Sequence, residues 1–287
     1  MELEKYNNIL PEQFNYESQR YNDIQMLKRL KHAMEAGEVM SGECIKTTEN
    51  GDMVIDLSPN IIGIIPRSEV TYIVEEDGKV HKGKAQKKVA LNVYFKVKKI
   101  VDTKNEQGQT VVLLSRKEVV EEIRDKYKKE LKPGHLVKGV VVGIEDYGAF
   151  IDIGGDVSGI LAKAEICKVW INHPSEKLTV GDPIDVVVKE PLGIKRDNEI
   201  LISFTRKPLY KDWSEIHKYF KRGEVVKGRV KDTNGAGGTG IFVEISDDFE
   251  GLANYKPGRR YSYGDFVRVR IDYIDPEKEK IKLTIID

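Results

Sequence analysis

Hydrophobic and polar residues alternate along most of this chain, in short runs. Alternation over about four to eight residues is the pattern of a strand with one buried face. Such runs recur in three groups of five, and the second run of each group reads IDL at 55–57, IDI at 151–153 and VEI at 243–245. Glycine-rich connections separate the runs. Five short strands with such connections favour a small closed barrel over a sandwich.

Each group opens with two glycines that lie five residues apart in the sequence. The pairs are Gly37 and Gly42, Gly134 and Gly139, and Gly223 and Gly228. Similar segments that recur along one chain are the signature of a repeated structural unit. We therefore predict a mainly β protein with three tandem five-stranded barrels of the oligonucleotide-binding (OB) type, at residues 37–117, 134–207 and 223–287.

Apolar residues spaced three and four apart predict helices between the barrels. One linker helix is predicted over 118–133, from Val120, Ile123, Tyr127 and Leu131, and a second over 208–222, from Trp213, Ile216 and Phe220. Before the first barrel, residues 1–36 are predicted to form a tail and a helix with the stripe Ile24, Leu27, Leu30 and Met34. Short α-helices would then join the barrels in a row.

The charge balance narrows the possible partners. The chain has 47 basic and 47 acidic residues, so its net charge is zero. Bulk positive charge therefore cannot hold a nucleic acid, and local patches or stacking would have to do so. No apolar run reaches membrane-spanning length, and the N-terminal MELEKYNN does not resemble a signal peptide. We expect a cytoplasmic monomer without a membrane partner, in which Cys44 and Cys167 are idle thiols.

The segment GAGGTG at 235–240 matches the G-x-G-x-x-G spacing of dinucleotide sites. That motif requires a helix directly after the glycines, because the pyrophosphate binds at the N-terminus of that helix. The residues that follow, 241–245, alternate like a strand. Ile241 and Phe242 stand where a Walker loop needs Lys and Ser or Thr. The segment is therefore predicted to be a connection between two strands, and no cofactor is expected.

Catalytic and metal-binding patterns are absent from the sequence. The five histidines form no H-E-x-x-H motif, and Cys167 with His173 gives only two potential metal ligands. Asp247 and Asp248 follow a strand directly after Ser246, which favours a solvated turn over a metal site. We expect no enzyme activity and no bound metal.

The parity of the second strand in each group predicts which side chains face outward. Ile151 and Ile153 belong to the barrel core, so Phe150 faces out. In the third group Phe242 faces out beside Glu244, and in the first group Val54 takes that place. An outward ring on this strand could stack against a nucleobase. Alternatively, the spacer helices cover these rings, and parity alone does not separate the two possibilities.

The second group contains DYGAF at 146–150 and W-x-x-HPSE at 170–176. With these motifs it resembles an RNA-binding repeat of the bacterial ribosomal protein S-one (S1) family. The first group is similar to that family's first repeat through GIIPRSEV at 63–70 and LLSRK at 113–117, and the third resembles a divergent repeat. The resemblance covers residues 37–287.

In that family, the RNA face consists of two aromatic residues on the second strand, a histidine after the third strand, and basic residues near the last. By this resemblance, Tyr147 and Phe150 occupy the two aromatic positions. Ala162 stands at the histidine position and is followed by Lys163. The motif also supplies two further candidates, Trp170 and His173. The second barrel is thus expected to be the best RNA binder.

The other two barrels match this pattern less completely. The third keeps Phe242, has Asn254 at the histidine position and has Lys280 before its last strand. Its segment YKPGRRYSYGDF mixes aromatic and basic residues, which suits RNA but equally suits a surface turn. The candidates there are Tyr255, Arg259 and Arg260. The first barrel has Val54 and Pro66 at the matching places and is expected to be a docking unit.

The strand 91–98 of the first barrel places Leu91, Val93, Phe95 and Val97 inward and Tyr94, Lys96 and Lys98 outward. A solvated basic edge that discourages strand pairing explains the outward lysines without any ligand.

The sequence therefore predicts a non-catalytic RNA-binding protein that holds single-stranded RNA or mRNA with low sequence specificity, in translation at the small ribosomal subunit. One alternative is an adaptor whose barrels dock on a ribosomal or RNA-processing protein; the departures from the family pattern at Val54, Pro66, Ala162 and Asn254 favour it. An enzyme of RNA metabolism is disfavoured, because no segment remains for a catalytic domain.

Overall fold

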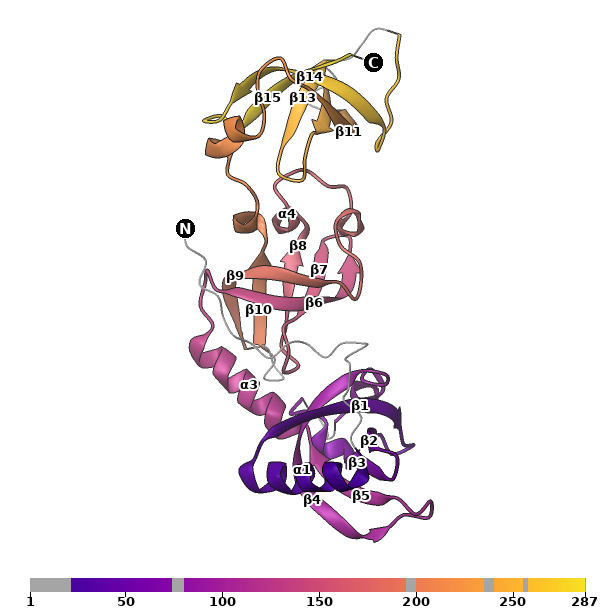
Figure 1. The fold of residues 1–287 in the computed structure, drawn as a ribbon. Helices are drawn as coiled ribbons and strands as arrows, with labels where there is room; N and C mark the ends of the chain where they lie inside the picture. Colours follow the sequence, from indigo (N-terminus) through magenta and orange to yellow (C-terminus); the bar gives the residue numbers. More distant parts are fainter. Residues whose placement is uncertain (1–21, 74–79, 195–199, 235–239, 255–257, 287) are drawn as a thin grey trace.

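The computed structural model describes residues 22–73, 80–194, 200–234, 240–254 and 258–286. They form three closed barrels of five strands each, which lie one after another along the molecule (Figure 1). In every barrel the first strand pairs with the second and fourth, and the fifth closes the barrel between the third and fourth. The predicted mainly β architecture of three OB-type barrels is confirmed.

The strands have the following bounds. The first barrel consists of β1 (Val39–Thr47), β2 (Met53–Ser58), β3 (Ile61–Ile65), β4 (Asn92–Lys104) and β5 (Thr110–Ser115). The second consists of β6 (Leu136–Glu145), β7 (Gly148–Asp152), β8 (Ser158–Ala162), β9 (Pro183–Ile194) and β10 (Ile200–Thr205). The third consists of β11 (Val225–Asn234), β12 (Gly240–Glu244), β13 (Glu250–Asn254), β14 (Phe266–Asp275) and β15 (Lys280–Ile285).

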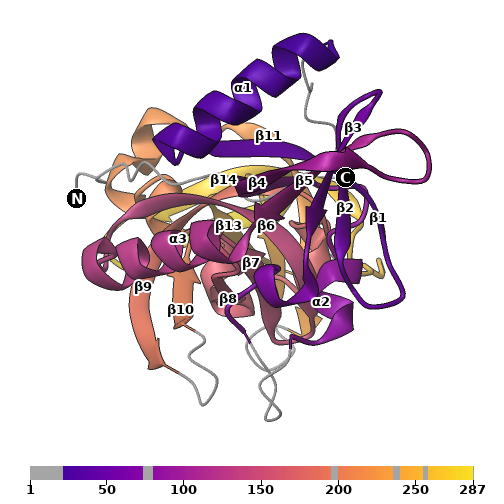
Figure 2. The ribbon, with the colours of Figure 1, turned by 90° about the horizontal axis from the view of Figure 1, so that it is seen from below.

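The helical segments are short. The α-helices are α1 (Asp23–Ala36), α2 (Lys82–Gln86), α3 (Lys117–Glu130) and α4 (Lys163–Ile166). The 3₁₀ segments are η1 (Arg67–Glu69), η2 (Pro174–Glu176), η3 (Lys207–Leu209) and η4 (Trp213–Lys218). Seen from below, α1 and α3 lie on the outside of the strands (Figure 2).

The repeated glycine pair has a structural explanation. The first glycine of each pair has a left-handed backbone, with φ of +67° at Gly37, +90° at Gly134 and +86° at Gly223, a region that glycine enters without steric cost. The second glycine allows the first strand to approach the second. A Cβ on Gly139 would lie 2.4 Å from Cγ2 of Ile151, which is buried in the barrel core.

Gly139→Ala is therefore expected to destabilise the protein by about 1–3 kcal/mol, because the added methyl group overpacks a filled core. Gly143→Ala, on the same strand, is the matched control, since its Cβ would lie at an ordinary 3.5 Å from the ring of Phe150. Urea unfolding of both variants measures the difference. Equal urea midpoints for the two variants would show that the close approach of Gly139 to Ile151 does not affect stability.

Helix α1 packs on the first barrel with a different face from the one predicted. Met26, Leu30 and Ala33 are buried, whereas Ile24 is 70% exposed and Met34 is 37% exposed. The rotation follows from a polar contact at the start of the helix. The carboxylate of Asp23 accepts hydrogen bonds from the hydroxyl of Ser58 (2.6 Å) and from the backbone and side-chain amides of Asn60. These bonds fix the helix about its axis.

Helix α3 is part of the second barrel's core as well as a connection between two barrels. Val120, Ile123, Tyr127 and Leu131 are buried, as predicted. The hydroxyl of Tyr127 donates to the carbonyl oxygen of Ile153 at 2.7 Å. Gly155 has a φ of +66°, and a Cβ there would lie 2.5 Å from Ile123. The helix is thus seated directly against the second barrel.

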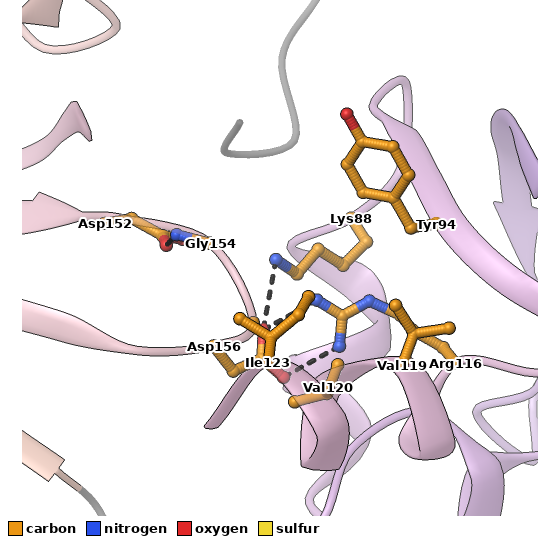
Figure 3. Close-up of a pocket in the computed structure, with 10 residues that line it drawn as sticks. Lys88, Tyr94, Arg116, Val119, Val120, Ile123, Asp152, Gly154 and Asp156 are labelled. Carbon is orange, nitrogen blue, oxygen red and sulfur yellow. Dashed lines mark hydrogen bonds and ion pairs between the residues drawn. The ribbon is translucent and has the colours of Figure 1, made fainter. Parts of the chain in front are cut away.

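A buried ion pair joins the first and second barrels (Figure 3). Two guanidinium nitrogens of Arg116 each donate to a carboxylate oxygen of Asp156 at 2.7 Å. The ammonium of Lys88 lies 3.3 Å from the same carboxylate. Burial opposes ionisation of Asp156, but Arg116 and Lys88 outweigh it and hold the pKa of that carboxyl well below its usual range. The first two barrels are therefore joined by one helix and one buried ion pair.

Between the second and third barrels, residues 208–222 do not form the predicted α-helix. Two 3₁₀ segments, η3 and η4, lie here instead. Trp213 and Ile216 are buried, and their spacing of three matches the 3₁₀ period of about three residues per turn. The Trp213 ring lies 5.1 Å from the Phe249 ring, centroid to centroid. The segment therefore packs onto the third barrel through the apolar residues that were predicted to share one face.

The outward lysines of β4 are not a solvated edge, so that interpretation was wrong. Strand β4 pairs with both β1 and β5, and a closed barrel leaves it no free edge. Lys96 forms an ion pair with Glu122, and Lys98 with Glu118, both on α3. The helix covers this part of the strand and provides the carboxylates.

GAGGTG connects β11, which ends at Asn234, with β12, which begins at Gly240; a strand follows it, as predicted, and residues 235–239 lie outside the described part, like the tail. Cys44 and Cys167 are both buried. Within the described ranges, no helix is long and apolar enough to cross a membrane. The same residues contain no group of three His, Cys, Asp or Glu side chains that could hold a metal ion.

Candidate nucleic-acid interface

Two aromatic rings project from the second barrel at the start of β7. Tyr147 is 56% exposed and Phe150 is 37% exposed, while Ile151 and Ile153 are fully buried. The rings meet edge to face with their centroids 6.3 Å apart. The outward orientation predicted from strand parity is confirmed for Phe150, and the alternative that a spacer helix covers this ring is wrong.

Lys163 and His173 lie around the same turn as the two rings. The backbone N–H of Lys163 donates to the carbonyl of Tyr147 at 2.8 Å, and its ammonium donates to the carbonyl of Asn172 at 3.2 Å. The imidazole Nε2 of His173 lies 3.3 Å from a carboxylate oxygen of Asp146, next to Tyr147. The structure thus brings four candidate residues together. The imidazole on this face comes from His173 in another loop, because Ala162 occupies the histidine position of the family pattern.

Cross-strand pairing defines an outer row on each barrel, which we use to compare them. In the second barrel the row runs over Gly143, Phe150, Ile160, Ser203 and Glu190. Glu190 therefore stands at one end of this row, and the aromatic rings stand near the other end, beside the pair of His173 and Asp146. The rings make this second end the one that suits stacked bases.

The outer row of the third barrel contains an aromatic residue that sequence reasoning missed. The row runs over Phe242, Leu252, Lys282 and Tyr273. Tyr273 is 54% exposed, and Phe242 is half-buried. Inward Val267, Val269 and Ile271 predict by parity that Tyr273 also points inward. A register shift between Ile271 and Tyr273 turns the tyrosine outward. Lys280 is exposed at the start of β15, next to the row.

The outer row of the first barrel offers no ring. It runs over Lys46, Val54, Ile64, Leu113 and Lys99. Val54 takes the predicted place on the strand, but it is only 4% exposed. The side of this barrel that corresponds to Phe150 is therefore aliphatic between two lysines.

Trp170 lies at the junction between the second and third barrels. Its backbone N–H donates to a carboxylate oxygen of Glu250 at 3.0 Å. Its ring centroid lies 6.3 Å from that of Tyr263, and the two rings are 48% and 40% exposed. Tyr263, which belongs to the YKPGRRYSYGDF segment, is thus paired with a residue of another barrel. Sequence spacing cannot predict such a pair.

The same junction is held by ion pairs. The ammonium of Lys231 is fully buried and lies 2.7 Å from Glu176 and 3.2 Å from Glu244. Glu244 also pairs with Lys177 at 2.6 Å. Burial opposes ionisation of Glu176, but hydrogen bonds from Lys231, Tyr263 and the backbone N–H groups of His173 and Asn172 together outweigh it and lower the pKa of that carboxyl to about 2. Glu244, predicted to face outward beside Phe242, is buried because this end of β12 faces the second barrel.

The other candidates of the third barrel have mixed surroundings. Arg259 and Arg260 are exposed, while Tyr255 lies outside the described residues. Asp247 and Asp248 pair with Lys177 and Lys211, so they contribute to the junction instead of forming only a solvated turn.

Residues 130–201 match the S1 RNA binding domain family. The chain is 31% identical over 270 residues to small ribosomal subunit protein bS1 of Neisseria meningitidis serogroup B, a match that covers 88% of this chain and 44% of the relative. The bS1 homolog of Bacillus subtilis is 27% identical and covers 89% of this chain and 65% of the relative. The chain thus spans about half the length of the curated relatives it matches. The resemblance drawn from the motifs is confirmed.

One solved structure with local similarity is that of an uncharacterised protein from Methanocaldococcus jannaschii. It is 35% identical over 28% of this chain and 97% of that chain, with a TM-score of 0.22. Because that score is low, the assignment of the fold rests on the strand topology of the three barrels.

Proposed function

We propose, from the relationship of this chain to the bacterial small ribosomal subunit protein bS1 and from its S1 RNA binding domain at residues 130–201, that the chain binds single-stranded RNA without catalysing a reaction. The pair of exposed rings at Tyr147 and Phe150 is the observation that carries this proposal. Flat exposed rings on an OB-type barrel give unpaired bases a surface on which to stack.

The second barrel provides the main contact. Bases stack on Tyr147 and Phe150, and each stack contributes about 1–3 kcal/mol. Lys163 and His173, which lie around the same turn, contact the phosphates. Because every base has a π-face, stacking of this kind is tolerant of sequence, and low sequence specificity follows. The third barrel adds Phe242 and Tyr273, and linking the barrels raises the effective concentration of the second contact.

The relatives, which are small ribosomal subunit proteins, support a biological setting for this proposal. In this proposal the chain holds mRNA at the small ribosomal subunit in the cytoplasm, acts as a monomer and needs no cofactor. The first barrel, which lacks an exposed ring on its outer row, serves as a docking unit for protein. A pull-down through this barrel that is insensitive to nuclease would support docking.

A fluorescence anisotropy titration with homopolymer RNAs at several salt concentrations tests RNA binding. If about four phosphates are contacted, the logarithm of affinity should fall with the logarithm of salt with a slope of roughly −3, since each phosphate of a single strand contributes about −0.7. Affinities for the different homopolymers should be similar. A double-stranded RNA of the same length is the control and should bind more weakly. Absence of binding to single strands at low salt would contradict the proposal.

A further inference from the structure

The third barrel has a basic and aromatic surface away from its outer row. On the ladder between β11 and β14, three outward pairs lie in register: Val225 with Arg270, Lys227 with Arg268, and Arg229 with Phe266. We call these six residues the β11–β14 strip; both strands are labelled in Figure 1. The alternate residues Val267 and Val269 are buried in the core. The strip therefore lies on the outside of the barrel and carries four cationic side chains.

Aromatic rings accompany these cations. Phe266 is 67% exposed, and the ammonium of Lys227 lies 4.3 Å from its ring centroid. The guanidinium of Arg229 lies 6.0 Å from the ring centroid of Tyr263, which in turn meets Trp170 of the second barrel. Rings with cations beside them are the combination that stacks bases while neutralising phosphates. The exposed rings thus continue from the strip to the junction between the barrels.

The cations of the strip are not all neutralised within the protein. Arg270 is paired with Asp272 through a bond of 2.9 Å. In contrast, the Nε–H of Arg229 is buried and has no hydrogen-bond partner among the residues that the structure describes. Arg229 is half-buried beside the ring of Tyr263, and its positive charge there favours an anionic ligand.

The barrel fold by itself does not require such a surface. At the corresponding ladder of the second barrel, the pairs are Leu136 with Val187, Lys138 with Asp185, and Val140 with Pro183, and both Val187 and Val140 are buried. At that of the first barrel they are Val39 with Lys96, Ser41 with Tyr94, and Glu43 with Asn92. Lys138 thus faces a carboxylate where Lys227 faces Arg268, and Lys96 is paired with Glu122. The strip is a property of the third barrel.

We propose that the β11–β14 strip, together with Tyr263 and Trp170, forms a second binding surface for single-stranded RNA. This inference rests on the proposed RNA-binding function and extends it to a surface other than the one around Tyr147 and Phe150. The RNA would pass over the junction between the barrels, stack on Trp170, Tyr263 and Phe266, and place phosphates beside Lys227, Arg229 and Arg268.

The test uses full-length Phe266→Ala and a Lys227→Ala, Arg268→Ala double variant, with an oligo(U) of about 20 nucleotides, longer than the ~4–16-nucleotide site of one OB fold. Phe266→Ala is expected to weaken binding about fivefold or more through the loss of one stack. The double variant should reduce the steepness of the salt dependence by about 1.4, since it removes two phosphate contacts. Lys138→Ala is the matched control, because it removes the same charge from the corresponding position of the second barrel, and it should change neither quantity.

The outcomes separate the two proposals. If the wild-type chain does not bind oligo(U), the proposed function fails. If the wild type binds, Tyr147→Ala weakens binding, and both strip variants match the wild type, only the second surface is overturned. Strip variants that bind RNA normally but lose an acidic protein partner would overturn it as well. Thermal unfolding of each variant checks folding, which should be unchanged because the substituted side chains are exposed.

Discussion

Arg116→Met is expected to lower the free energy of unfolding by about 3–5 kcal/mol, because it leaves a buried carboxylate without its main partner. The side chain of Arg116 is only 2% exposed, and it donates both to Asp156 and to the carbonyl of Val70. After the substitution, Lys88 is the ammonium that remains near Asp156. The loss of stability should affect both barrels, since Arg116 follows the last strand of the first barrel and Asp156 belongs to the second.

Urea unfolding followed by circular dichroism measures this effect. Lys218→Ala is the control, because the exposed pair of Lys218 with Glu215 should contribute less than about 1 kcal/mol. In the Arg116→Met background, Asp156→Asn should recover part of the loss, since it removes the unpaired charge. Asn suits that position because residue 156 has a φ of +54°. A loss below about 1 kcal/mol in Arg116→Met would mean that the pair does not stabilise the junction.

Tyr147→Ala and Phe150→Ala are each expected to weaken binding to single-stranded RNA by roughly fivefold or more, the effect of one lost stack of about 1–3 kcal/mol. The double variant should lose less than the sum of the two single effects, since the rings are in contact. Folding should be unaffected, because both rings are exposed. Anisotropy titration with oligo(U) at fixed salt is the measurement.

Tyr147→Phe keeps the ring and removes the hydroxyl, so it should bind nearly as the wild type does and serves as the control. Wild-type affinity in the Tyr147→Ala, Phe150→Ala double variant would show that RNA binds elsewhere on the chain. Crosslinking of RNA to the β11–β14 strip would then show whether the third barrel carries the activity alone.

The two junctions differ in the forces that hold them. Helix α3 inserts apolar residues into the second barrel, and Arg116 adds a buried ion pair, so the first two barrels should move as one unit. The second and third barrels meet through Lys231, Glu176, Glu244 and Lys177, whose attraction depends on close ionic contacts. RNA bound across Trp170 and Tyr263 would stabilise this second junction further.

Much of the fold can be read from the sequence, because strand alternation and glycine placement are local properties. The inward side chain of Ile151 and the outward ring of Phe150 follow from the period of two along one strand. A glycine occupies the position of Gly139 in every barrel, because each first strand must approach the second closely. The exposure of Phe150 belongs to this part of the candidate site, since its direction follows from its own strand.

The remaining features depend on segments that are distant in the sequence, so only the tertiary structure decided them. Asp23 set the rotation of α1 through Ser58, and a register shift against β15 turned Tyr273 outward. Glu244 became buried because the second barrel provided Lys177. The register between β11 and β14 placed Lys227 beside Arg268. Each strand by itself shows only basic residues that alternate with apolar ones. The pairing of the two strands gathers these basic residues into one surface.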